Sequence, residues 1–263
     1  MPKTPDRHVL YEAAVQGIDY DLDFAARLFR RLRGRPARVM REDFCGTAAL
    51  SAGWVLRSPD NVAYGVDLDP EPLKWARKHR LSRMNGAPRV HLVQGDVLHA
   101  RTPRADVTLA HNFSFWVFKQ RPQLLAYFRA AWRALKKDGV LVLSMYGGTE
   151  SFEPAIEKRR IPASQAVDGT RLPAFQYIWD QERFDPMTHE VFCSISFKVP
   201  GHKLMKRAFT YDWRLWTLPE VLELLAEAGF SARTYVDLGD GVYHQRTSFR
   251  NQPGWLAILA GIK

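Results

Sequence analysis

A small-residue turn between two short apolar segments is the feature that most constrains what this chain can fold into. The first segment ends in Glu42-Asp43-Phe44-Cys45-Gly46-Thr47-Ala48, and the second, Ala63-Tyr64-Gly65-Val66-Asp67, ends in a carboxylate. Their separation is the one that a strand, a helix and the next parallel strand require. A carboxylate placed there can accept hydrogen bonds from both hydroxyls of a ribose, so the sequence predicts a nucleoside-cofactor site.

Apolar periodicity around this turn alternates between strand and helix, which is typical of a parallel sheet covered by helices. Two helices, 10–16 and 21–32, are expected before the first strand. The alternating elements that follow are strand 37–42, helix 47–57, strand 62–67, helix 70–84, strands 89–94 and 105–110, helix 121–136, strand 139–145, helix 218–228 and strands 230–236 and 255–260.

The pattern changes to β-rich runs at 175–184, 190–199 and 203–211, with Asp185-Pro186-Met187-Thr188 as a turn, and predicts an antiparallel insertion. We therefore expect three parts: an N-terminal helical cap (1–36), a cofactor-binding domain (37–150 and 212–263) and an inserted antiparallel cap (151–211) over the acceptor site.

Composition restricts the classes of protein to which this chain can belong. With 263 residues and 46% hydrophobic content, the chain can form one large α/β domain with an inserted subdomain. Its two cysteines, Cys45 and Cys193, lie far apart and have no zinc-ligand spacing, which favours a reducing compartment without a disulfide framework or metal. The start of the chain has no signal-peptide pattern, and no apolar stretch is long enough to span a bilayer. A cytoplasmic protein without membrane contact is expected.

The formal net charge of +10 comes in part from arginines between Arg27 and Arg41. These arginines can form a solvated helix face or a phosphate-binding patch. The first is favoured, because no aromatic residues are interleaved with them. The pattern therefore disfavours a nucleic-acid partner without excluding one.

Further motifs follow the later strands in register with the turn. They are Gln94-Gly95-Asp96-Val97, the segment Leu135-Lys136-Lys137-Asp138-Gly139 before an apolar strand, and the late helix and strand from Trp216 through Ala228-Gly229-Phe230. Over about residues 37–260 this order resembles the class I S-adenosylmethionine-dependent methyltransferases. The resemblance implies a Rossmann-like, doubly wound α/β fold: a mostly parallel seven-stranded sheet with an antiparallel last strand, plus a small antiparallel β insertion.

The chain departs from that family at the turn, where Phe44 and Ala48 replace the first and third glycines and only Gly46 remains. Ala48 is compatible with close packing of helix on strand. We expect the bulkier Phe44 to line the site near the methionine part of the cofactor or to lie beneath it.

The resemblance assigns S-adenosyl-L-methionine as the cofactor and gives roles to individual side chains. Asp67 is expected on the ribose, Glu42 near the methionine ammonium, Asp96 and the Val97 N–H at the adenine edge, and Leu68 on the adenine face. Alternatively, Asp67 and Asp96 cap the turns that follow them, and Arg41 pairs with Glu42 or Asp43 instead of the cofactor carboxylate. The full expected set is Tyr20, Arg41, Glu42, Phe44, Cys45, Gly46, Thr47, Asp67, Leu68, Asp96, Val97 and Asn112.

On the acceptor side, His111 after the fourth alternating strand is the best-placed general base, although a structural histidine is at least as probable. Tyr146 is the second catalytic candidate. Tyr11, Trp116, Tyr177, Trp179 and Arg214 are candidates for binding the acceptor, but aromatic residues on strands are more often core. The long loop 239–253, which carries Tyr243, is a candidate lid.

The sequence thus favours an S-adenosylmethionine-dependent methyltransferase that acts on a small organic acceptor through O, N or C, as a monomer or homodimer. Two alternatives stay open: a nucleic-acid methyltransferase and a non-catalytic S-adenosylmethionine-binding protein.

Overall fold

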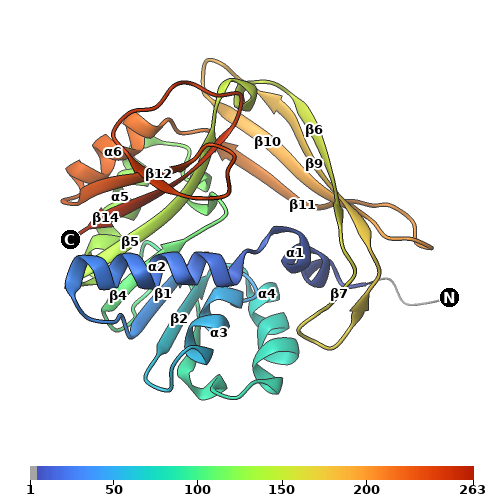
Figure 1. The fold of residues 1–263 in the computed structure, drawn as a ribbon, viewed down its shortest axis with the longest axis horizontal. Helices are drawn as coiled ribbons and strands as arrows, with labels where there is room; N and C mark the ends of the chain where they lie inside the picture. The colour runs from blue at the N-terminus through green and yellow to red at the C-terminus, as the bar shows by residue number, and fades with distance from the viewer. Residues whose placement is uncertain (1–4) are drawn as a thin grey trace. The chain divides into compact units, whose positions relative to one another are not determined.

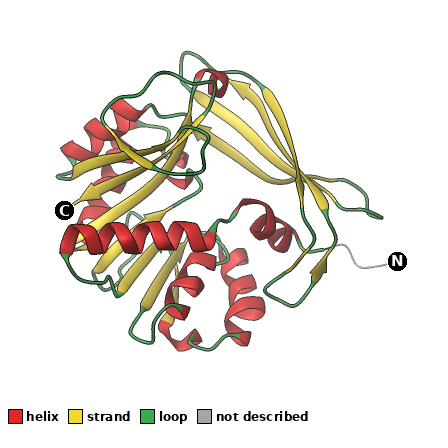
Figure 2. Ribbon diagram, viewed as in Figure 1, coloured by secondary structure: helices red, strands yellow, loops and turns green. Residues whose placement is uncertain are grey.

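A computed structural model describes residues 5–263, and this part of the chain divides into two compact units. One unit combines α1 (Arg7–Val15) with Glu150–Leu215; the other comprises Gly17–Thr149 and Trp216–Lys263 (Figure 1). The helices α1 and α2 (Ile18–Arg33), which we grouped in the predicted segment 1–36, fall in different units, and residues 1–4 of that segment lie outside the described residues. Figure 2 shows the contrast between the mainly β segment Glu150–Leu215 and the mixed α/β unit.

In the described chain, the α/β unit is built on an eight-stranded sheet in the order β13-β12-β14-β5-β4-β1-β2-β3. Its strands β1 to β5 are parallel, and β14 runs antiparallel to both β5 and β12. The predicted Rossmann-like sheet with an antiparallel last strand is confirmed, and the short β13 extends it at one edge. The strands are β1 (Val39–Asp43), β2 (Val62–Asp67), β3 (Val90–Gln94), β4 (Ala105–Ala110), β5 (Leu135–Gly147), β12 (Ser231–Asp237), β13 (His244–Arg246) and β14 (Trp255–Ile262).

Helix α2 crosses one face of this sheet (Figure 1) and shares a core there with α3 (Ala49–Leu56), in which Leu22, Phe29 and Trp54 are buried. Helix α2 ends at a glycine, as many helices do: Gly34 adopts the left-handed conformation with φ of 69°. The α/β unit also contains α5 (Arg121–Ala134) and α6 (Leu218–Glu227), which begins at a Thr217/Glu220 capping box.

The helix predicted over 70–84 is interrupted. It begins as α4 (Pro70–Trp75), capped by Asp69, continues as a π-helix, η1 (Ala76–Arg80), and ends in a 3₁₀ turn, η2 (Leu81–Arg83). The wider π-helical turn leaves Arg80 buried, where its Nε donates to the Thr47 carbonyl at 3.1 Å. The turn after β1 is therefore tied to η1 through a residue that helical periodicity did not single out.

The other unit contains a four-stranded antiparallel sheet, β11-β10-β9-β6, within the described residues, and a small pair β7-β8. Its strands are β6 (Ala155–Ile161), β7 (Ser164–Gln165), β8 (Arg171–Leu172), β9 (Phe175–Phe184), β10 (Glu190–Lys198) and β11 (Met205–Arg214). The sequence pattern missed β6, because Glu157 to Arg160 form an exposed charged run. Such charges are typical of an edge strand that must resist pairing with other chains.

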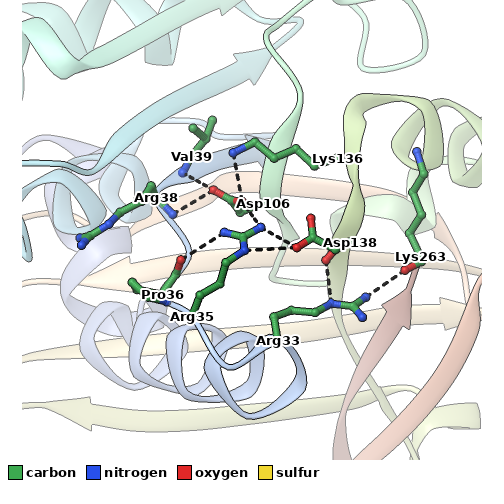
Figure 3. Close-up of polar contacts among 9 residues, drawn as sticks. All are labelled: Arg33, Arg35, Pro36, Arg38, Val39, Asp106, Lys136, Asp138 and Lys263. Atoms are coloured by element: carbon green, nitrogen blue, oxygen red, sulfur yellow. Dashed lines mark hydrogen bonds and ion pairs between the residues drawn. The ribbon is translucent and has the colours of Figure 1, made fainter.

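The end of the eight-stranded sheet opposite the turn after β1 holds an ion-pair network around Asp106 (Figure 3). This carboxylate is fully buried and accepts from the backbone N–H groups of Arg38 and Val39 at 2.9 and 2.8 Å, and from the side chains of Arg35 and Lys136 at 2.9 and 3.0 Å. Burial alone would raise the pKa of Asp106, but these donors lower it below its ordinary value.

We expect Asp106→Asn to lower the free energy of unfolding by roughly 2 to 3 kcal/mol, since charge-assisted hydrogen bonds to a buried group are lost. Because the pKa of Asp106 is depressed on folding, its stabilisation is complete above the ordinary value of 3.8 and disappears as the pH falls through the folded-state value. Urea unfolding should therefore show a weaker acid dependence in the variant. Asp60→Asn, which removes an exposed partner of Arg38, is the control and should change stability by less than about 0.5 kcal/mol.

Several of the arginines between Arg27 and Arg41 form hydrogen bonds and ion pairs within the α/β unit. Arg33 donates to the carbonyls of Asp138 and Lys263, Arg35 pairs with Asp106 and Asp138, and Arg38 pairs with Asp60. Arg27, Arg30 and Arg31 are exposed on α2, as expected of a solvated helix face. The nucleic-acid alternative therefore rests on fewer arginines than the sequence suggested.

No helix in residues 5–263 combines the length and apolarity needed to cross a membrane.

Candidate functional site

The candidate cofactor site lies where the sheet changes direction of growth, between β1 and β4. The chain winds from β1 to β2 and β3 on one side, then returns to β4 on the other side. In doubly wound folds, ligands bind beyond the carboxyl ends of the strands at this position. The turn after β1 and the segment His111-Asn112 after β4 both occupy it.

Backbone conformation explains why glycine is usual at three positions of the turn after β1, since a positive φ is unfavourable for any residue with a Cβ. Phe44, Gly46 and Ala48 all have positive φ values, of 57°, 52° and 55°. A Cβ atom added to Gly46 would meet nothing within 4 Å, so there is open space over the centre of the turn. The ring of Phe44 lies 5.6 Å from that of Tyr127 and 6.0 Å from that of Phe118. Phe44 therefore packs within the α/β unit and leaves Gly46 uncovered.

Alternation along β1 sends neighbouring acidic side chains to opposite faces. Glu42 points to α3, where the backbone N–H of Ser51 donates to its Oε2 at 2.8 Å and the Ser51 hydroxyl also donates to it. Burial raises the pKa of Glu42 to about 7, although the Ser51 hydrogen bonds and Arg80 oppose the shift. Glu42 therefore lies near the end of β1, and its role toward the methionine ammonium stays a prediction.

Arg41 resolves an alternative that the sequence left open. Its Nε lies 2.7 Å from Asp43 Oδ1, and the two side chains are 2% and 0% exposed. Its remaining nitrogens donate to the carbonyls of Val97 and Ala100 at 3.1 and 3.2 Å. These contacts favour the ion pair with Asp43 over the predicted contact with the cofactor carboxylate. Arg41 instead fixes the turn that carries Asp96 and Val97.

Asp67 reaches back to the turn after β1. Its Oδ2 accepts from the Gly46 N–H at 2.7 Å and its Oδ1 from the Asp69 N–H at 2.9 Å. Its half-buried position raises its pKa through desolvation, against the opposing hydrogen bonds from Asp69 and Gly46. Of the other turn residues, Cys45 is buried with its Sγ close to Gly65, and Thr47 is buried beside Arg80.

The predicted adenine-binding residues lie after β2 and β3. Leu68 is 70% exposed, as an apolar side chain available to a ring would be, and Val97 is buried. Asp96 uses Oδ1 to accept from the Leu98 N–H at 2.9 Å, so it does cap the following turn. Capping occupies one of its two carboxylate oxygens, and its adenine role stays a prediction.

The segment after β4 brings together His111 and a residue that sequence reasoning missed. His111 is 7% exposed, and its Nδ1 lies 3.6 Å from Asp21 Oδ1 on α2. Asn112 adopts a left-handed backbone conformation with φ of 54°. Asp21 carries no local signal, because an acidic residue in the first turn of a helix is ordinary.

Tyr146 and Trp116 meet in one aromatic cluster at the end of β5. Phe113 lies 4.9 Å from Tyr146 and 5.6 Å from Trp116, and Trp116 lies 4.7 Å from Tyr146, between ring centroids. Trp116 is 0% exposed, which favours a core position over direct contact with an acceptor, whereas Tyr146 is half-buried. The acceptor role of Trp116 therefore has no support from its exposure.

Tyr20 contacts the predicted lid. Its ring centroid lies 5.8 Å from that of Tyr243, and its hydroxyl accepts from the Tyr243 N–H at 3.4 Å. Tyr243 also packs 6.0 Å from Phe24. The loop that follows β12 is therefore anchored on α2 close to Asp21, whose charge contributes to a raised pKa of Tyr243 after the larger effect of burial.

In the other unit, Tyr11, Tyr177 and Trp179 gather on one face of the antiparallel sheet. Tyr11 shares a side-chain hydrogen bond with Tyr211, which lies 5.8 Å from Trp179, and the Arg159 guanidinium lies over Tyr177. Arg214 departs from this group, since alternation along β11 places it opposite Trp213. Arg214 therefore lies on the other face of the sheet from the aromatic residues with which we predicted it to bind the acceptor.

The residues described also lack any group of three histidine, cysteine or acidic side chains able to hold a metal ion.

Comparisons with known proteins agree with this fold. Residues 42–139 match the family model of a methyltransferase domain. DesVI of Streptomyces venezuelae is similar in structure, with a TM-score of 0.72 at 15% identity over 99% of each chain. CalS10, an amino pentose methyltransferase from Micromonospora echinaspora solved with bound S-adenosylmethionine, has a TM-score of 0.70 at 16% identity over 98% of each chain. The sugar N-methyltransferase KedS8 from Streptoalloteichus sp has a TM-score of 0.69 at 17% identity, covering 100% of this chain and 94% of its own. No curated protein matches by sequence.

Proposed function

We propose that this chain is a class I S-adenosylmethionine-dependent methyltransferase that methylates a small organic acceptor, a proposal supported by its methyltransferase domain over residues 42–139 and by its fold. The observation that carries the proposal is the hydrogen bond from the Gly46 N–H to Asp67. It joins the turn after β1 to the carboxylate at the end of β2, at the change of direction in the sheet.

The residues present fit this cofactor. Open space over Gly46 allows a ligand to approach the backbone, and half-buried Asp67 and exposed Leu68 offer a carboxylate and an apolar surface beside it. We assign the ribose hydroxyls to Asp67, the ammonium to Glu42 and the adenine to Leu68, Asp96 and Val97.

When bound, S-adenosylmethionine supplies a methyl group on a sulfonium, whose thioether leaving group needs no proton. The protein therefore contributes mainly by orienting the acceptor and excluding water. The amino pentose and sugar substrates named for two similar structures support a small acceptor.

Calorimetric titration with S-adenosylmethionine, S-adenosylhomocysteine and NAD tests the proposal. Binding of the first two without NAD is the expected result, followed by formation of S-adenosylhomocysteine when an acceptor is supplied. Binding with no turnover on any acceptor would favour the non-catalytic alternative, and binding of NAD alone would contradict the proposal.

We expect cofactor binding to release a proton from Glu42 near pH 7. The pKa of this buried carboxyl is raised to about 7, and a nearby ammonium favours its ionised form. At about pH 7, the binding enthalpy should be more negative in Tris than in phosphate, because Tris takes up a proton with more heat. Well above the pKa of Glu42 the carboxyl group is already ionised, so the proton release on binding should vanish. Glu42→Gln is the control, and an unchanged buffer dependence in this variant would exclude Glu42 as the source.

A further inference from the structure

Asp21 and His111 form a pair that is separated in sequence but joined in the α/β unit. Asp21 comes from the first turn of α2, and His111 follows β4 at the change of direction in the sheet. Their 3.6 Å separation is an ion-pair distance, longer than a hydrogen bond. Distances of this kind often shorten when a catalytic site binds its substrate.

The pairing determines which nitrogen of His111 is left for chemistry. An ionised Asp21 facing Nδ1 favours the proton on that nitrogen, which leaves the lone pair on Nε2. Within residues 5–263, Nε2 is buried and accepts no hydrogen bond. A buried nitrogen without a partner costs about 1 to 3 kcal/mol, so its presence beside the candidate cofactor turn indicates a role other than stability.

The surroundings of the pair favour a cation. Tyr243, on the loop after β12, packs 5.8 Å from Tyr20, and after the larger effect of burial the charges of Asp21 and Asp237 contribute to its raised pKa. Carboxylates attract a positive charge, and tyrosine rings stabilise one through cation–π contact. A protonated amine would meet both, together with a base for its proton.

We propose that Asp21 is a positioning residue that holds His111, through Nδ1, with Nε2 available to take a proton from an aliphatic ammonium acceptor. This inference rests on the proposed methyltransferase function and narrows its acceptor to an amine. His111 Nε2 takes one proton from the ammonium and frees the nitrogen lone pair. That lone pair forms the N–C bond as the methyl C–S bond breaks, and the sulfur keeps the electron pair. The imidazolium then releases its proton to solvent.

The first test uses nitrogen-15 NMR of labelled histidine and needs no acceptor. We expect neutral His111 to be the Nδ1–H tautomer, and Asp21→Asn to move its population toward the Nε2–H form. Asp19→Asn is the matched control, since it removes an equivalent charge from the same turn of α2 but has a fully exposed side chain. An Nε2–H tautomer in the unmodified protein, or a population that ignores Asp21, would overturn the positioning role.

The second test measures formation of S-adenosylhomocysteine with a panel of aliphatic amines and the matching alcohols. With an amine acceptor, His111→Gln should lower kcat by roughly 100-fold or more. Asp21→Asn should lower it by about 10- to 100-fold, with KM within about threefold, because geometry rather than binding is lost. Both deficits should narrow as the pH rises toward the pKa of the amine, where the acceptor is already neutral. If the substitution only removed a structural contact, the kcat deficit would not shrink as the pH rises.

The outcomes separate the two levels of proposal. Failure to bind S-adenosylmethionine contradicts the methyltransferase function itself. Binding of S-adenosylmethionine with methylation of alcohols but no amine, or with amine methylation that Asp21→Asn leaves unchanged, contradicts only the inference about Asp21 and His111.

Discussion

Replacing Asp67 by alanine should weaken S-adenosylmethionine binding by roughly 30- to 700-fold. This range corresponds to about 2 to 4 kcal/mol, the expected loss when two ribose hydroxyls no longer donate to one carboxylate. The effect is large because the side chain has two functions. We assign it to the ribose hydroxyls, and its Oδ2 also accepts from the Gly46 N–H at 2.7 Å, which holds the turn in place.

Two variants separate these functions. Asp67→Asn keeps an oxygen that can accept from Gly46 but removes the charge, so it should bind the cofactor with intermediate affinity. Asp69→Ala removes the cap of α4, where Asp69 accepts from the Glu71 N–H at 2.9 Å. This substitution should lower the free energy of unfolding by about 1 kcal/mol without weakening cofactor binding. Calorimetry at one pH measures all three, and an unchanged dissociation constant in Asp67→Ala would remove Asp67 from the ribose role.

Replacing Arg41 by methionine should lower the free energy of unfolding by roughly 3 to 5 kcal/mol. The single substitution leaves Asp43, which is fully buried, without its ionic partner. It also removes the donors to the Val97 and Ala100 carbonyls, so the turn after β3 loses its link to β1. Urea unfolding monitored by tryptophan fluorescence measures the loss.

A double variant identifies its origin. Arg41→Met with Asp43→Leu replaces both charges by apolar groups and should recover much of the stability, since no buried charge is then left unpaired. The Tyr127 hydroxyl, which lies 3.1 Å from Asp43 Oδ2, loses its partner in this variant and limits the recovery. A single variant as stable as the unmodified protein would show that Asp43 is neutral in the fold.

The sequence by itself indicated the methyltransferase domain, the mostly parallel sheet and the positions of the turn residues, because these depend on local patterns. The strand that ends at Asp67, the cap at Asp69 and the motif around Gly46 each require only a few consecutive residues. The partner of Arg41 was also within reach of the sequence. Residues two apart on a strand share a face, so Arg41 belongs with Asp43 and not with Glu42.

Only the tertiary structure decided the contacts between distant segments. Asp21 meets His111 because α2 packs across the sheet beside the end of β4, and no pattern within α2 records that neighbour. Arg80 reaches Thr47 because α4 widens into a π-helix, which changes the direction of one side chain without changing the apolar spacing. Packing and long-range geometry set these contacts, whereas periodicity reports only which face of an element is buried.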